Sequence, residues 1–225
     1  MLQFIKGFNL LIFALFTVFY AYQLFYVLAA LWHDRKKTPM PPAKRLHKYA
    51  AVISARNEST VIGELIHSIK KQNYPAELLD VFVVADNCTD NTAAVARRAG
   101  AILFERFNRK EVGKGYALDY AFQRIEKDYA AAGYEGYFIF DADNLLDANY
   151  VAEMNKVFDS GCRVITSYRN SKNYDSNWIS AGSALWFLRE AKYLNNSRMI
   201  LGTNCAVSGT GFLVASDVIR AHGGW

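Results

Sequence analysis

The chain contains 225 residues, enough for one α/β domain with its own hydrophobic core and a short appendage. Because 52% of the residues are hydrophobic and 21% are charged, the composition excludes an intrinsically disordered chain. The net charge of +5 arises in residues 1–48, which hold seven lysine or arginine side chains and one acidic side chain. This distribution is typical of a chain that meets a membrane surface, and it argues against a nucleic-acid partner.

A long apolar segment opens the chain, and its residues 8–32 carry no charge. As a helix they would extend about 37 Å, enough to cross a bilayer with some tilt. The alternatives are a buried core helix and a signal peptide, but a signal peptide has a shorter apolar region that follows its basic residues. We therefore predict a transmembrane anchor over residues 1–34, followed by a basic, proline-rich linker over 35–48. Since Arg35, Lys36 and Lys37 follow the segment, the globular part should face the cytoplasm at the cell membrane.

After the linker, short apolar runs alternate with longer amphipathic ones. Runs rich in β-branched and aromatic residues predict strands near 49–54, 80–85, 101–106, 136–140 and 163–168. Apolar residues at helical spacing predict helices over 58–72, 90–99, 115–130 and 147–159. The alternation predicts an α/β fold, with a mostly parallel sheet and helices on both faces, over residues 49–225.

Polar residues follow three of the predicted strands. Asn57 and Glu58 follow the first, Asp86 follows the second, and Asp141 and Asp143 follow the fourth. Ligands of parallel sheets bind at the carboxyl ends of the strands, so three polar ends on one edge indicate a site. Two carboxylates one residue apart suit Mg²⁺ or Mn²⁺, which prefer oxygen ligands and neutralise a diphosphate. The structural alternative is that these residues cap the helices that follow.

A glycine–lysine–glycine turn precedes the third predicted helix. Gly113 and Gly115 would let the backbone approach a ligand closely, and Lys114 is placed to meet a phosphate. The turn is not a P-loop, because the G-x-x-x-x-G-K-[ST] spacing is absent. A solvated lysine on an exposed turn is the alternative.

Five short motifs resemble, in order, those of the family-2 glycosyltransferases, which have a nucleotide-binding α/β fold called GT-A. They occupy residues 54–58, 83–92, 113–119, 141–143 and 209–212, and the last resembles the glycine-containing strand that lines the donor-sugar and acceptor pocket. The resemblance implies that a UDP-sugar is bound by Asn57, Glu58, Asp86, Lys114, Asp141, Gly209 and Gly211, with Mg²⁺ or Mn²⁺ on Asp141 and Asp143. It also implies that a hexosyl or N-acetylhexosaminyl group is transferred, with inversion, to a polysaccharide or glycolipid acceptor at the cytoplasmic membrane face.

Two motifs of that family do not occur in these residues: the T-E-D-like motif that carries the catalytic base, and the Q-x-x-R-W motif of the processive members. We therefore expect a longer protein, in which the domain continues past residue 225 and further transmembrane helices follow. Two other functions stay open. One is a nucleotide-sugar-binding module without catalysis. The other is a sugar-phosphate nucleotidyltransferase, although that class normally has a glycine-rich loop where this chain has residues 56–60 without glycine.

Overall fold

The computed structural model describes residues 1–34 and 40–225. These residues form two compact units. The described residues of the anchor unit are 1–34 and Tyr168–Ala206, and the sheet unit consists of Met40–Ser167 and Val207–Trp225. Residues 35–39 of the predicted linker lie outside the described residues. They include Arg35, Lys36 and Lys37, on which the predicted orientation rests.

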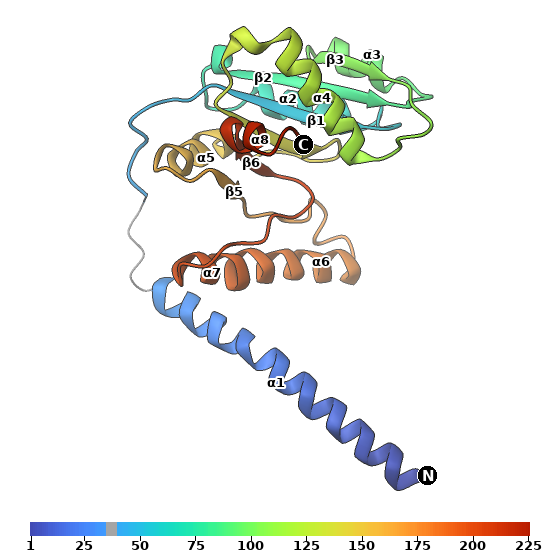
Figure 1. Cartoon of the computed structure of the whole chain (residues 1–225), viewed down its shortest axis with the longest axis vertical. Coiled ribbons are helices and arrows are strands. Elements are labelled where there is room, and N and C mark those ends of the chain that lie inside the picture. Colours follow the sequence, from blue (N-terminus) through green and yellow to red (C-terminus); the bar gives the residue numbers. More distant parts are fainter. Residues whose placement is uncertain (35–39) are drawn as a thin grey trace. The chain divides into compact units, whose positions relative to one another are not determined.

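The sheet unit contains six strands in the order β3-β2-β1-β4-β6-β5 (Figure 1). Strand β1 pairs in parallel with β2 and β4, and β2 pairs in parallel with β3, while β6 runs antiparallel between β4 and β5. The predicted mostly parallel sheet is thus confirmed. The strands are β1 Tyr49–Ala55, β2 Leu79–Asp86, β3 Ile102–Arg106, β4 Gly136–Asp141, β5 Val164–Thr166 and β6 Phe212–Ala215.

Each of the four predicted helices is present, but each begins or ends within its predicted range. The first helix is an example: the N–H of Val61 donates to the Glu58 carbonyl at 3.1 Å in a turn, and the helix begins only at Ile62. The helices of this unit are α2 Ile62–Lys70, α3 Thr92–Arg98, α4 Lys114–Asp128, α5 Tyr150–Asp159 and α8 Ser216–Ala221, with 3-10 turns at Ala76–Leu78 and Ala130–Ala132.

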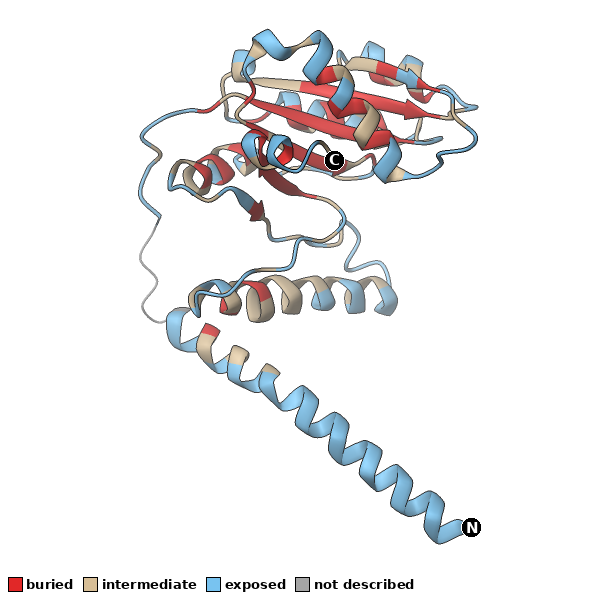
Figure 2. Cartoon of the chain, viewed as in Figure 1, coloured by how far each residue is buried: buried red, intermediate tan, exposed pale blue. Residues whose placement is uncertain are grey.

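Helices cover both faces of the sheet, as the alternation of elements predicted. Along β1, Tyr49, Ala51 and Ile53 pack with α2, α3 and α5. Ala50 and Val52 point to the opposite face and pack with α4 and α8. Successive side chains of a strand alternate between faces, and a strand covered on both sides is apolar along its length. The buried centre of the sheet in Figure 2 follows from this packing.

The anchor unit is helical. Helix α1 spans Leu2–Asp34 and is long and apolar enough to cross a membrane. A second helical segment, residues 178–200, consists of α6 Trp178–Leu188, a π-helical stretch η3 Arg189–Asn195 and α7 Asn196–Ile200. The side chain of Asn177 caps its first turn by accepting the N–H groups of Ile179 and Ser180, both at 3.0 Å. No helix was predicted here, since residues 178–188 carry no charge to mark a polar face.

Candidate functional site

The carboxyl end of β4, the start of α4 and residues 209–211 meet in one cluster. Lys114, the first residue of α4, forms an ion pair with Asp141 and donates a hydrogen bond to the carbonyl of Gly209. The N–H of Asp141 donates to Thr210 Oγ1 at 2.7 Å, and the N–H of Gly211 donates to the backbone of β4 at 2.8 Å. Four of the predicted site residues, Lys114, Asp141, Gly209 and Gly211, are therefore neighbours in the structure.

The glycine-containing segment is a turn and not a strand, which corrects the expectation from the family motif. Gly209 and Gly211 have φ of 51° and 69°, in the left-handed region that glycine adopts without steric cost. Strand β6 begins only at Phe212. The turn places the hydroxyl of Thr210 between the backbone of Asp141 and the side chain of Asn144.

The second predicted metal ligand, Asp143, lies exposed on the loop after β4, where its Oδ1 accepts a hydrogen bond from Asn144 Nδ2 at 3.2 Å. The carboxylate of Asp141 is 41% exposed. Within the described ranges, no group of three or more His, Cys, Asp and Glu side chains is placed to hold a metal ion. Mg²⁺ is commonly held by one or two carboxylates and completes its shell with substrate phosphates and water, so its binding does not require a group of that size.

Asp86, at the end of β2, lies in a buried ion pair that the sequence reasoning missed. Arg106 Nη1 donates to Asp86 Oδ1 at 2.8 Å, and the two side chains are 7% and 6% exposed. The same Arg106 nitrogen donates to the Glu111 carbonyl at 2.8 Å, and Asn87 Nδ2 donates to the same Asp86 oxygen at 3.1 Å. The only sequence signal was an arginine at the end of a mainly apolar run, residues 101–106.

Hydrogen bonds of Asn57 and Glu58, two residues of the predicted site, connect the segments that follow β1 and β2. Asn57 Oδ1 accepts the N–H of Thr89 at 2.8 Å, and the N–H of Glu58 donates to Thr92 Oγ1 at 2.8 Å. Asn57 therefore has a structural role, and its left-handed φ is one that asparagine tolerates better than most residues. Hydrogen bonding from the Thr92 hydroxyl holds the pKa of the neighbouring Asp90 carboxyl well below its ordinary value, although some desolvation opposes the shift.

A hollow of about 590 Å³ lies beside this ion pair, between the end of β3 and α4. It offers the exposed rings of Phe107 and Tyr116, which are suited to stack on a flat heterocycle. Its lining residues are Glu105, Arg106, Phe107, Asn108, Glu111, Tyr116, Asp119, Tyr120 and Gln123.

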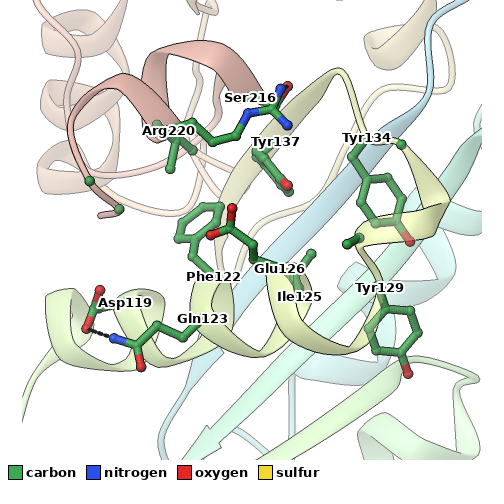
Figure 3. A pocket seen from close by; sticks show the side chains of 15 residues that line it. Asp119, Phe122, Gln123, Ile125, Glu126, Tyr129, Tyr134, Tyr137, Ser216 and Arg220 are labelled. Atoms are coloured by element: carbon green, nitrogen blue, oxygen red, sulfur yellow. Dashed lines mark hydrogen bonds between the residues drawn. The ribbon is translucent and has the colours of Figure 1, made fainter.

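A second hollow, of about 380 Å³, lies between α4 and α8 (Figure 3). It is lined by aromatic side chains, including Phe122 and Tyr137, together with Glu126 and Arg220. None of the predicted nucleotide or metal ligands lines it. The hollow next to Arg106 is not lined by a predicted ligand either, but Arg106 joins it to Asp86, one of the predicted site residues.

The parallel sheet with an antiparallel β6, and polar groups at the carboxyl ends of β1, β2 and β4, define the GT-A type of α/β fold. Solved structures agree with this fold. The mannosyltransferase PcManGT from Pyrobaculum calidifontis, solved with GDP-Man and Mn²⁺, has a TM-score of 0.65 at 20% identity, and the match covers 95% of this chain and 57% of that chain. Glucosyl-3-phosphoglycerate synthase from Mycobacterium tuberculosis, solved with Mn²⁺, UDP and phosphoglyceric acid, has a TM-score of 0.50 at 17% identity over 77% of this chain and 57% of that one.

The sequence comparison gives the family. The family model described as glycosyltransferase like family 2 matches residues 47–225, so the chain belongs to glycosyltransferase family 2. The β-monoglucosyldiacylglycerol synthase of Synechocystis sp. is 24% identical over 184 residues, which cover 77% of this chain. The chain spans 36% of the length of that relative.

Proposed function

We propose that this chain binds the donor of a membrane-bound glycosyltransferase, which moves a sugar from a UDP-sugar to a lipid or polysaccharide acceptor at the cytoplasmic membrane face. The observation that carries the proposal is the cluster of Lys114, Asp141 and Gly209 on the same sheet edge as Asp86. The lipid product in the name of the Synechocystis relative supports a lipid acceptor. Membership of family 2 favours sugar transfer over nucleotidyl transfer.

The base of the nucleotide would be read by Asp86. In the part of the chain that the structure describes, its hydrogen bonds from Arg106 and Asn87 reach Oδ1, which leaves Oδ2 to accept an N–H of the base. Because Arg106 holds the carboxylate in one orientation, this acceptor is fixed before the ligand arrives. The rings beside the hollow next to Arg106 would then pack against the base.

The diphosphate would lie over the start of α4. The side chain of Lys114 is 34% exposed, so its ammonium is able to exchange Asp141 for a phosphate oxygen. The N-terminus of the 15-residue helix α4 adds a favourable field for an anion. Asp141 and Asp143 would hold Mg²⁺ or Mn²⁺, which neutralises the charge of a departing diphosphate.

Transfer is inferred to proceed by attack of an acceptor hydroxyl on the anomeric carbon. The bond to the diphosphate breaks as the new glycosidic bond forms on the opposite face, so the configuration inverts, and a carboxylate base takes the hydroxyl proton. Helix α1 would anchor the chain in the cell membrane, with the sheet unit in the cytoplasm where nucleotide sugars are available.

Calorimetric titration with UDP, in the presence of Mn²⁺ and then of chelator, tests the proposal. We expect Asp143→Asn to weaken Mn²⁺-dependent UDP binding by at least about tenfold, because a metal ligand is lost. Asp147→Asn is the matched control, since it removes an exposed carboxylate from the same loop and should bind like the wild type. Equal affinity of the Asp143 variant and the wild type would show that Asp143 does not hold the metal. Titration with GDP in place of UDP tests the choice of base.

A further inference from the structure

Thr210 lies between two glycines in the turn that precedes β6. Gly209 and Gly211 both have a positive φ, so the chain turns sharply on each side of Thr210. The turn is attached to its surroundings at both glycines. Lys114 donates to the carbonyl of Gly209, and the N–H of Gly211 donates to the carbonyl of Ile139 at 2.8 Å. These contacts fix the backbone that carries the Thr210 hydroxyl.

The hydroxyl of Thr210 continues the pairing of β4 past the start of β6. The antiparallel register of the two strands ends where Ile139 lies opposite Phe212. Two residues further along β4, the N–H of Asp141 donates to Thr210 Oγ1 at 2.7 Å. On the other side of β4, Asp141 is aligned with Ser54 of β1. The backbone of Asp141 is therefore held between a strand and a side-chain hydroxyl.

The same hydroxyl sets the orientation of the Asn144 amide. A hydroxyl that accepts one hydrogen bond still has its own hydrogen to donate, and Thr210 donates it to Asn144 Oδ1. That oxygen also lies 3.3 Å from the backbone nitrogen of Asp141. Because Oδ1 serves as the acceptor, the amide nitrogen points the other way, and Asn144 Nδ2 donates to Asp143 Oδ1 at 3.2 Å.

One chain of hydrogen bonds thus reaches both predicted metal ligands. It holds Asp141 through its backbone and Asp143 through its carboxylate. Asp143 is exposed, and an exposed side chain loses rotamer freedom when it is fixed by a ligand. A partner that orients it beforehand reduces this cost. Hydrogen-bond partners of metal-ligating carboxylates typically change metal affinity by about 10–100-fold.

We propose that Thr210 and Asn144 are positioning residues, which orient Asp141 and Asp143 for a divalent cation before the donor diphosphate binds. Neither would touch the cation, since each acts through a carboxylate residue. The proposal rests on the proposed function, because it requires that these two aspartates hold the metal. It assigns a role in metal affinity to a hydroxyl that is 69 positions from Asp141 along the chain.

Matched variants separate the hydroxyl from the shape of the side chain. Thr210→Val keeps the branched side chain but removes both hydrogen bonds, whereas Thr210→Ser keeps the hydroxyl. Asn144→Leu removes the amide at nearly the same volume. Ser167→Ala is the control, because Ser167 Oγ donates to the carbonyl of Gly211 at 2.8 Å. This bond holds the same turn but is no part of the chain of bonds to the aspartates.

Electron paramagnetic resonance of Mn²⁺ measures the binding, since the sharp signal of free Mn²⁺ disappears when the ion is bound. The full chain in detergent micelles is titrated at a fixed UDP concentration, against UDP without protein. We expect Thr210→Val and Asn144→Leu each to weaken Mn²⁺ binding by about tenfold, and Thr210→Ser and Ser167→Ala to stay within about twofold of the wild type. The double variant Thr210→Val with Asn144→Leu should bind about as weakly as the weaker single variant, because both substitutions break one chain of bonds.

The outcomes distinguish the positioning role from the proposed function. Wild-type affinity in Thr210→Val would overturn the positioning role and leave metal binding by the aspartates intact. An equal loss in Ser167→Ala, or no recovery in Thr210→Ser, would assign the effect to the stability of the turn and overturn the proposal. If the wild type itself shows no UDP-dependent Mn²⁺ binding, both the positioning role and the proposed function are wrong.

Discussion

The buried ion pair between Arg106 and Asp86 is where a single substitution should matter most in the sheet unit. The two charged groups are 2.8 Å apart, and both side chains are less than a tenth exposed. Replacement of Arg106 by methionine keeps an unbranched apolar stem but removes the charge. Asp86 would then be a buried carboxylate without its cation, which typically costs about 3–5 kcal/mol.

Two further contacts change the expected loss in the free energy of unfolding. Arg106 also donates to the Glu111 carbonyl, and the loss of such a bond costs about 1 kcal/mol. The Asn87 amide still donates to Asp86 in the variant, which offsets part of the loss. We therefore expect Arg106→Met to lower the free energy of unfolding by about 3 kcal/mol, a large part of the 5–15 kcal/mol that holds a typical domain together.

Urea unfolding of the full chain in detergent micelles, followed by circular dichroism, measures the effect. At the usual dependence on urea, a loss of this size lowers the midpoint by about 1 M or more. Arg97→Met is the matched control, because its partner Glu105 is 3.1 Å away but the pair is 66% and 43% exposed. Exposed pairs contribute at most about 1 kcal/mol.

The double variant Arg106→Met with Asp86→Leu separates charge burial from packing. Replacement of both partners by apolar side chains is often close to neutral, so stability should recover relative to Arg106→Met alone. If Arg106→Met destabilises the chain no more than Arg97→Met does, burial of the pair does not set its contribution to stability. If the double variant is less stable than both single variants, the unpaired buried charge is not the cause of the loss.

Two predictions concern stability elsewhere in the sheet unit. The Thr92 hydroxyl keeps the pKa of Asp90 below its ordinary value of about 4, so this stabilisation is present above pH 4 and is lost as the pH falls further. The stability gap between the wild type and Asp90→Asn should therefore shrink below about pH 4 in urea titrations, and an equal gap at pH 6 and pH 3 would contradict this. A Cβ at Gly136 would lie 3.0 Å from Leu213 Cδ1, so Gly136→Ala should cost about 1–3 kcal/mol by overpacking. Gly115→Ala, where nothing lies within 4 Å, is the control and should not destabilise the chain when thermal melts of the two variants are compared with the wild type.

The sheet was largely predictable because its strands are covered on both faces. Residues 49–55 are almost continuously apolar, and that pattern identified β1 within one residue of its observed bounds. The helix starts were less predictable. The first residues of the 58–72 run have suitable side chains for a helix, but the left-handed Asn57 and its bond to Thr89 hold them in a turn.

The order of polar residues along the chain indicated which side chains meet at the sheet edge. Lys114 and Asp141 are 27 positions apart, but Lys114 directly precedes a predicted helix and Asp141 directly follows a predicted strand, so the topology of a parallel sheet brings them together. The ion pair of Asp86 was not predictable in the same way. Its partner Arg106 belongs to another strand, and the β2–β3 register that aligns the two residues is set by pairing that a local pattern does not contain.

What the sequence by itself determined is the apolar segment of membrane length, five of the six strands, four helices of the sheet unit and the polar side chains at the strand ends. Each of these follows from a local pattern of apolar, polar and chain-breaking residues. What only the tertiary structure decided is how distant residues are paired and which apolar surfaces stay uncovered. The segment 178–188 shows the difference: its composition fits a buried helix as well as an exposed one, and only its packing shows that Trp178 and Trp186 face outward. Burial depends on the rest of the chain, so it is a property that a short stretch of sequence does not carry.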